Sequence, residues 1–179
     1  MSLKVTKIED FAYKIDEERP ESSSIKRITF NKEMEISENM FQGLSNEQRI
    51  ALEKFAKREN LFLTGPAGTG KTYLIKKMYE LASMNSSKKT AVCAMTGCAA
   101  LLLECNAKTL HSWSGIKLAK GTKEEVVKSV LFNKFALKSW KSAQTIILDE
   151  VSMLSKKVFE IIEEIGRRVK HSDLPFGGM

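Results

Sequence analysis

The chain has 179 residues, of which 42% are hydrophobic and 28% charged, and its formal net charge is +7. This length suffices for one domain with a hydrophobic core but is too short for two large ones. No apolar run reaches the roughly 18 residues that a membrane-spanning helix needs, and the first residues, Met1–Lys7, lead into acidic side chains rather than the apolar stretch of a secretory signal.

The three cysteines are Cys93, Cys98 and Cys105. They form no C-x-x-C pair and their number is odd, so neither a disulfide framework nor a zinc site is expected. Free thiols are typical of a reducing compartment. We therefore expect an intracellular protein, and the pattern does not distinguish nucleus, mitochondrion and cytoplasm.

Positive charge is concentrated in the later part of the chain. Residues 1–43 carry 7 basic and 9 acidic side chains, whereas residues 44–179 carry 22 and 13. Such an excess favours association with a polyanion such as nucleic acid. Many soluble domains, however, carry a solvated basic surface, so the charge alone leaves both interpretations open.

The first 43 residues contain neither sustained periodicity nor a chemical motif. Short apolar stretches are interrupted at Pro20–Ser24, and Gly43 ends the segment. We interpret residues 1–43 as an N-terminal extension or linker, with one strand around Ile28–Phe30 and a short helix. Residues 44–179 are then the globular part.

Helices and short apolar strands alternate through the rest of the chain. A capping box formed by Ser45 and Gln48 starts a helix that runs to about Arg58. A second helix follows a glycine-rich turn, residues 126–142 are mainly helical, and Ser155 caps the last helix. The predicted apolar faces of the first, second and last of these helices are Leu52, Phe55 and Ala56; Leu74, Met78 and Leu81; and Val158, Ile161, Ile162 and Ile165.

Three predicted strands, Leu61–Thr64, Thr90–Thr96 and Thr145–Asp149, are short, mostly apolar and separated by helices. This pattern is typical of an α/β protein with a parallel sheet covered by helices on both faces. In such sheets ligands bind at the carboxyl ends of the strands. The two motifs described next both lie at that edge.

The segment Gly65–Thr72 matches G-x-x-x-x-G-K-[ST] at every defined position and lies between a predicted strand and a predicted helix. Its glycines let backbone N–H groups close around phosphate oxygens, and the helix directs its positive end toward the same anion. Lys71 can reach the β- and γ-phosphates, and the Thr72 hydroxyl can bind Mg²⁺. The candidate nucleotide-binding residues of this P-loop are Gly65, Pro66, Ala67, Gly68, Thr69, Gly70, Lys71 and Thr72.

Two adjacent carboxylates, Asp149 and Glu150, end the third predicted strand. A P-loop NTPase needs an acidic residue near Mg²⁺ and a group that orients or activates water. Asp149 fits the first role and Glu150 the second, which indicates hydrolysis rather than nucleotide binding alone. The alternative is that the two carboxylates only mark the start of a helix.

Gln48 has two competing interpretations. It completes the capping box with Ser45, which needs no nucleotide, or it recognises adenine from a position just ahead of the P-loop strand. One side chain could not easily serve both purposes, and the local sequence does not separate them.

Several motifs occur in a restrictive order, and together they resemble the petite-integration-frequency (PIF) helicases of superfamily one, which are similar to RecD. The resemblance covers residues 44–179, about three quarters of the chain, and includes the Q, P-loop, Ia and DE-box motifs. The segments that carry it are Leu44–Gln48, Gly65–Thr72, Thr96–Ala100, Thr109–Ile116, Leu148–Leu154 and Pro175–Met179.

This resemblance implies a RecA-like motor domain that depends on ATP and Mg²⁺ and moves 5′ to 3′ on single-stranded DNA in replication, repair, recombination or telomere maintenance. It assigns Gln48 to the adenine contact, and it places Thr96, Gly97, Thr109 and His111 along the DNA path. Hydroxyls, backbone amides and an imidazole can all bond phosphates. Without the resemblance, Trp113 is better interpreted as a core residue than as a base-stacking platform.

The sequence departs from the family pattern in two respects. Trp113-Ser114 stands where the family more often has phenylalanine and alanine. The family also continues beyond P-F-G-G with a further strand, a γ-phosphate sensor and a second RecA-like domain that supplies an arginine finger. Because such a finger is worth about 10³–10⁵ in rate, we expect residues 44–179 to be a partial motor domain that is weakly active or inactive alone.

Two alternatives remain. A P-loop kinase for a small molecule would leave Thr109–Gly115 unexplained. A nucleotide-binding module without motor activity would share the P-loop but not the stimulation of ATP turnover by DNA. The sequence makes no prediction about oligomeric state.

Overall fold

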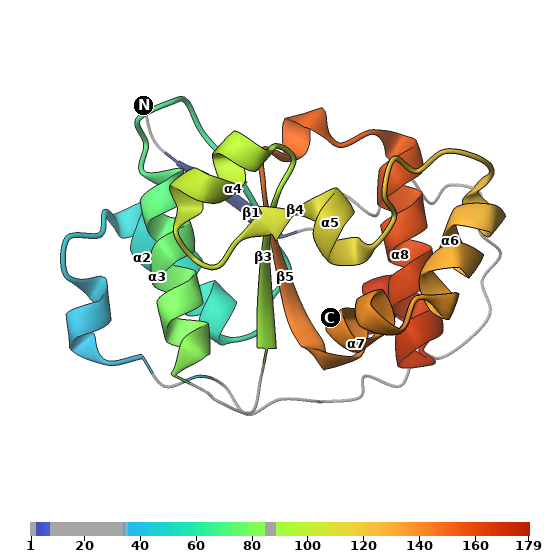
Figure 1. The fold of residues 1–179 in the computed structure, drawn as a ribbon. Coiled ribbons are helices and arrows are strands. Elements are labelled where there is room, and N and C mark those ends of the chain that lie inside the picture. Colours follow the sequence, from blue (N-terminus) through green and yellow to red (C-terminus); the bar gives the residue numbers. More distant parts are fainter. Residues whose placement is uncertain (1–2, 8–33, 35, 85–88) are drawn as a thin grey trace, which may run out of the picture. The chain divides into compact units, whose positions relative to one another are not determined.

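Two groups of secondary-structure elements follow each other along the chain in the computed structural model (Figure 1). The structure describes residues 3–7, 34, 36–84 and 89–179. Contacts divide the chain into a first unit, Met1–Leu81, and a second unit, Ala82–Met179. The first unit contains β1 (Lys4–Lys7), the 3₁₀ helix η1 (Glu38–Phe41), α2 (Asn46–Ala56), β2 (Leu61–Thr64) and the start of α3 (Lys71–Ser83).

The second unit carries the larger number of elements. Its strands are β3 (Lys89–Ala94), β4 (Lys108–Thr109) and β5 (Ala143–Asp149). Its helices are α4 (Gly97–Leu103), α5 (Leu110–Ser114), α6 (Lys123–Phe132), α7 (Lys134–Ser142) and α8 (Lys156–Lys170), with the 3₁₀ helices η2 (Val151–Met153) and η3 (Pro175–Gly177).

Helix α2 begins with the predicted capping box. The Ser45 hydroxyl accepts a hydrogen bond from the backbone N–H of Gln48 at 3.3 Å, and the Gln48 side-chain oxygen accepts one from the backbone N–H of Ser45 at 3.0 Å. The predicted apolar residues Leu52, Phe55 and Ala56 are all buried. The helix ends at Ala56, slightly before the predicted end.

Strand β2 has the predicted bounds, but its partner was not predicted. It pairs antiparallel with β1, so that Lys4 lies opposite Thr64 and Lys7 opposite Leu61. Strand β1 was not predicted because a four-residue strand with two lysines lacks a clear apolar pattern. The strand that we expected around Ile28–Phe30 lies outside the described residues. Within residues 1–43 the structure describes one short helix, the 3₁₀ helix η1.

The second unit contains a parallel sheet with the strand order β4-β3-β5. The α/β class is therefore confirmed. The predicted strands at 90–96 and 145–149 are observed as β3 and β5. Within the described residues the parallel ladders join only β4, β3 and β5, and the P-loop strand β2 is paired with β1 instead.

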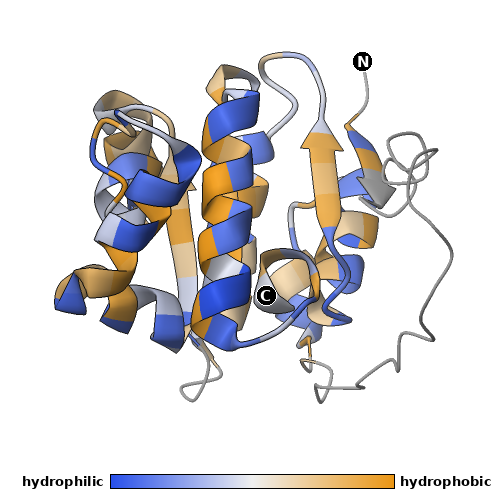
Figure 2. Ribbon diagram, turned by 90° about the vertical axis from the view of Figure 1, so that its right-hand side faces the viewer, coloured by the Kyte–Doolittle hydropathy of each residue, from blue (hydrophilic) through white to orange (hydrophobic). Residues whose placement is uncertain are grey.

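The core of the second unit forms where α8 packs with α6, α7 and the parallel strands. All four predicted apolar residues of α8 are buried, and Ser155 caps the helix by accepting from the backbone N–H of Val158 at 3.3 Å. Figure 2 shows the same amphipathic character, with hydrophobic and hydrophilic bands alternating along the helices. Trp140 is fully buried, and its ring N–H donates to the carbonyl of Ser114 at 2.9 Å.

Residues 126–142 are mainly helical, as predicted. The segment consists of α6 and α7, which meet at Asn133. The Asn133 side-chain oxygen accepts hydrogen bonds from the backbone N–H groups of Phe135 and Ala136 at 3.1 and 3.2 Å, so it caps the second helix. Asparagine competes with the helical backbone in this way and favours helix starts over helix interiors.

None of the described helices is long and apolar enough to cross a membrane.

Candidate functional site

The P-loop connects β2 to α3 in the order that the sequence predicted. Two of its glycines adopt positive φ angles, 81° at Gly68 and 77° at Gly70, which residues with a Cβ rarely adopt. At Gly70 a Cβ would in addition collide with the side-chain nitrogen of Gln48. The backbone conformation therefore favours glycine at Gly70, and a side chain there would also displace the Gln48 amide.

Lys71, the first residue of α3, donates hydrogen bonds to backbone carbonyl groups of the P-loop. Its ammonium group donates to the carbonyl oxygens of Gly65 at 2.7 Å and of Pro66 at 2.8 Å. The Thr69 hydroxyl donates to the same Pro66 oxygen at 2.9 Å. An ammonium group has three N–H donors, so one remains for a further acceptor. The next residue, Thr72, is exposed in the first turn of α3.

Gln48 joins the start of α2 to the P-loop. Its side-chain oxygen serves the capping box, while its amino group donates to the main-chain carbonyl of Thr69 at 3.1 Å. The side chain is buried. We expected that one glutamine could not easily serve both a cap and a nucleotide site. The capping box, however, uses only the oxygen and leaves the amino group for the P-loop, so the two interpretations do not exclude each other.

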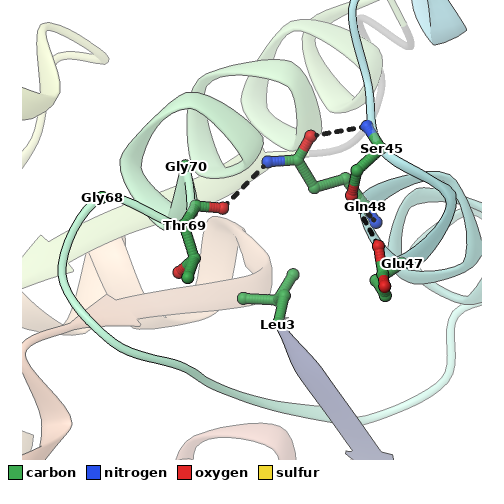
Figure 3. A pocket seen from close by; sticks show the side chains of 7 residues that line it. All are labelled: Leu3, Ser45, Glu47, Gln48, Gly68, Thr69 and Gly70. Atoms are coloured by element: carbon green, nitrogen blue, oxygen red, sulfur yellow. Dashed lines mark hydrogen bonds between the residues drawn. The ribbon is translucent and has the colours of Figure 1, made fainter. Parts of the chain in front are cut away.

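A pocket of about 380 Å³ lies beside this hydrogen bond. Figure 3 shows side chains from three segments around it: the start of β1, the start of α2 and the P-loop. Its volume is within the range of small-molecule sites, about 300–1,000 Å³. The lining residues are Leu3, Ser45, Glu47, Gln48, Gly68, Thr69 and Gly70.

The pocket has one negatively charged wall. The Glu47 carboxylate accepts a hydrogen bond from the Ser45 hydroxyl at 2.9 Å. The pKa of Glu47 is lowered by a backbone hydrogen bond and by the hydroxyl of Ser45. Glu47 is therefore ionised at neutral pH and disfavours phosphate groups at its end of the pocket.

The carboxylates of Asp149 and Glu150 lie at the carboxyl end of β5, as predicted. Asp149 is the last residue of the strand, and one of its side-chain oxygens accepts from the backbone N–H of Glu150 at 2.9 Å. Glu150 is exposed and has a φ of 55°. A residue other than glycine adopts this left-handed conformation at a cost of about 1–3 kcal/mol. The chain thus makes a sharp turn at the carboxylate that we assigned to water activation.

The candidate DNA-contacting residues lie at the same edge of the parallel sheet. Ala94, which ends β3, is in register with Thr109 of β4 on one side and with Asp149 of β5 on the other. Thr96 and Gly97 follow the end of β3 after one intervening residue, and His111 follows Thr109 by two residues. The fold therefore brings together motifs that are separated by up to about 50 residues in the sequence.

Both threonines of this group cap short helices. The Thr96 hydroxyl accepts from the backbone N–H of Ala99 at 3.2 Å, and the Thr109 hydroxyl accepts from the backbone N–H of Ser112 at 3.3 Å. A hydroxyl that accepts one hydrogen bond keeps its own proton for a second partner. Caps of this kind fix the position of the side chain and leave its donor free for a ligand.

Trp113 packs against the core, as the sequence predicted. Its ring centroid lies 4.7 Å from that of Trp140, with the ring planes at 49°. The side chain is partly buried against the core cluster of the second unit. The interpretation of Trp113 as a core residue is confirmed.

Of the residues that line the pocket, Ser45 and Glu47 were predicted only as parts of the segment Leu44–Gln48, and Leu3 was not predicted at all. It lies within the segment that we interpreted as an extension, and it has no motif around it. Only the pairing of β1 with β2 brings it to the P-loop, and this pairing joins residues about 60 positions apart.

Comparisons with known proteins identify a matching family and several similar proteins. The model of the family described as "PIF1-like helicase" matches residues 43–179. The ATP-dependent DNA helicase RRM3 of Saccharomyces cerevisiae is 35% identical over 134 residues, which cover 74% of this chain and 18% of RRM3.

Two solved structures are similar to the chain. The Pif1 helicase from Candida albicans matches with a TM-score of 0.70 and 35% identity over 76% of this chain and 31% of that one. The Pif1 helicase from Bacteroides in complex with ADP-AlF3 and single-stranded DNA matches with a TM-score of 0.50 and 30% identity over 64% and 25%. The chain thus spans less than a third of each of these proteins. The match of the family model to more than half of its residues shows that the chain belongs to the PIF1-like helicase family.

Proposed function

We propose that this chain forms the ATP-binding part of an ATP-dependent DNA helicase. The observation that carries the proposal is the hydrogen bond between Gln48 and the carbonyl of Thr69, which joins the glutamine motif and the P-loop in one pocket. A glycine-rich turn alone would not need this link. Residues 44–179 are then the partial first motor domain, and residues 1–43 are an extension. The strand β1 of this extension pairs with β2 in the first unit.

ATP would lie with its phosphates on the P-loop and its base near Gln48. The N–H groups of the loop and the start of α3 suit the phosphates, and Lys71 has a remaining N–H donor for them. The Gln48 side chain keeps one lone pair on its oxygen and one N–H on its nitrogen beyond the two hydrogen bonds described above. This acceptor and donor match the amino group and N7 of adenine.

Thr72 and Asp149 would hold Mg²⁺, and Lys71, Asp149 and Glu150 would support hydrolysis. Mg²⁺ prefers oxygen ligands and is usually held by one or two protein groups together with phosphates and water. The exposed Thr72 hydroxyl and the free oxygen of Asp149 fit that preference. Within the described ranges no group of three His, Cys, Asp or Glu side chains could form a protein-only metal site. Glu150, exposed at the end of β5, would orient and deprotonate the attacking water.

Single-stranded DNA would contact the edge of the sheet at Thr96, Gly97, Thr109 and His111. The two capped threonines keep their hydroxyl protons available for phosphate oxygens, and His111 is partly exposed on α5 beside them. The excess of basic residues in 44–179 favours the same partner. Because its substrate would be DNA, we expect the protein to act inside the cell. The resemblance to the family implies 5′-to-3′ movement, with a role in replication, repair, recombination or telomere maintenance.

Binding of a fluorescent ATP analogue with Mg²⁺ tests the proposal on the 179-residue chain. We expect Lys71→Ala and Gln48→Ala each to weaken binding by about tenfold or more, because each loses a hydrogen bond to the nucleotide and a tie within the loop. Lys138→Ala, on the exposed face of α7, is the control for loss of a positive charge. If the folded chain does not bind the analogue, the proposal is wrong.

The motor activity needs a second experiment with a chain that extends to the length of the relatives. We expect single-stranded DNA to stimulate its ATP hydrolysis, and we expect Glu150→Gln to abolish the hydrolysis. ATP turnover that a small-molecule acceptor stimulates and DNA does not would favour a kinase instead. Nucleotide binding without stimulated turnover would favour a module without motor activity.

A further inference from the structure

Leu3 contributes to the nucleotide pocket from outside the segment that matches the family. Its side chain is 5% exposed and lines the pocket together with Gln48 and the P-loop. The family model begins at residue 43, so this contribution belongs to the N-terminal part of the chain. Figure 3 shows the side chain of Leu3 pointing from the start of β1 into the space between Thr69 and Glu47.

The pairing of β1 with β2 fixes this position. Because Lys4 and Thr64 form the last pair of the antiparallel ladder, the next residues, Leu3 and Gly65, lie beside each other at the start of the P-loop. A Cβ on Gly65 would lie 3.4 Å from the Leu3 Cα and 3.5 Å from one of its methyl groups. Leu3 therefore lies beside the first residue of the P-loop, at a separation that a Cβ on Gly65 would fill.

The charges around the pocket indicate which part of a nucleotide meets Leu3. The ionised Glu47 disfavours phosphates at its end, whereas the N–H groups of Gly68–Lys71 favour them at the other. The amide of Gln48 offers hydrogen bonds in one plane, as the edge of a base requires. Leu3 offers only methyl groups and methylenes, which pack against the flat apolar face of a base but make no hydrogen bond.

We propose that Leu3 is a base-contacting residue of this site, packing against the face of the adenine whose edge Gln48 reads. The inference rests on the proposed function and deepens it, because it adds β1 to the elements that recognise the nucleotide. The P-loop binds the phosphates of any nucleoside triphosphate, Gln48 selects the base, and Leu3 adds apolar contact with the face of that base.

Affinity measurements with two ligands, Mg²⁺-ATP and Mg²⁺-tripolyphosphate, test this role in the 179-residue chain. Removing the three outer carbons of Leu3 in Leu3→Ala takes away apolar contact with the base, and we expect ATP to bind about tenfold more weakly. Tripolyphosphate has no base, so its affinity should stay the same. Leu3→Met keeps the apolar volume and should bind ATP nearly as well as the unaltered chain.

Val5→Ala is the matched control within the same strand. Val5 pairs with Leu63, is partly buried and does not line the pocket. We expect this variant to bind both ligands as the unaltered chain does. Thermal unfolding of each variant, followed by circular dichroism, establishes that the compared proteins are folded at the temperature of the binding experiment.

Three results would overturn the inference. The first is an unchanged ATP affinity in Leu3→Ala, and the second is an equal loss for ATP and tripolyphosphate, which would show that Leu3 only supports the loop. The third is an equal loss in Leu3→Ala and Val5→Ala, which would show a general effect of β1. An unaltered chain that binds neither ligand would overturn the proposed function and this inference with it, whereas the first three results would leave the proposed function intact.

Discussion

The amino group of Gln48 donates a hydrogen bond to the main-chain carbonyl of Thr69 at 3.1 Å, across 21 positions of the sequence. The same side chain accepts from the backbone N–H of Ser45 through its oxygen. The start of α2 and the turn of the P-loop are thus held by the two ends of one amide. A ligand that contacts this amide would contact a side chain that is hydrogen-bonded to both segments.

Gln48→Glu separates the two roles of this side chain. Glutamate keeps the oxygen that caps α2 but has no N–H for the Thr69 carbonyl. We expect the helix to remain capped and the free energy of unfolding to fall by about 1–3 kcal/mol, because the partly buried hydrogen bond to the Thr69 carbonyl is lost and a charge replaces a buried amide. Binding of ATP should weaken and its preference over GTP should be lost.

Denaturant unfolding and a competition assay with ATP and GTP measure both effects. Glu47→Gln, on the neighbouring residue of the same helix, is the control for a change of one unit of charge. A variant Gln48→Glu that still prefers ATP to GTP would show that Gln48 does not read the base.

Because Glu150 has a left-handed conformation, we expect its replacement by glycine to have opposite effects on stability and activity. Glycine adopts a φ of 55° without the steric cost of a Cβ. We therefore expect Glu150→Gly to raise the free energy of unfolding by about 0.5–1 kcal/mol while abolishing ATP hydrolysis in the extended protein. Glu150→Gln should lose hydrolysis without the gain in stability. A less stable glycine variant would show that the turn does not strain this residue.

Trp140 is expected to be a main contributor to the stability of the second unit. It is fully buried, contacts Trp113 and donates a hydrogen bond to the Ser114 carbonyl. Trp140→Phe removes part of the ring and leaves that carbonyl without its partner, so we expect a loss of about 2–4 kcal/mol in the free energy of unfolding. Trp113→Phe, at the edge of the core, should cost less. Equal losses in urea unfolding would contradict this ranking.

Because the thiol of Cys93 is buried, we expect the folded protein to lose stability in alkaline solution. Burial raises the pKa of this thiol from 9.0 to about 12. The unfolded chain therefore releases the thiol proton at a lower pH than the folded chain, so the contribution to stability is complete below pH 9 and is lost as the pH rises toward 12. The pH dependence of unfolding between pH 9 and 12 should be shallower in Cys93→Ala than in the unaltered chain.

Thiol labelling of the native protein tests independently whether Cys93 is buried. Cys98 is exposed on α4, whereas Cys93 is buried. A small alkylating reagent should modify Cys98 in the folded chain and reach Cys93 only upon unfolding. Rapid labelling of Cys93 under native conditions would mean that the parallel sheet opens readily.

The sequence by itself determined the features that depend on short stretches of the chain. The P-loop is recognisable because phosphate binding requires glycines and a lysine at fixed spacing, and α8 is recognisable because one face of a helix repeats every 3.6 residues. The capping box at Ser45 and the carboxylates after β5 are likewise local. Each of these predictions about position in an element was confirmed.

Only the tertiary structure decided which distant segments meet. The break at Asn133 depends on a side-chain hydrogen bond that competes with the helix. The register of Thr109, Ala94 and Asp149 depends on strand pairing between segments that no local pattern joins. The same holds for Leu3, since a short strand with two lysines has no pattern of its own and gains its position from the backbone hydrogen bonds of β2.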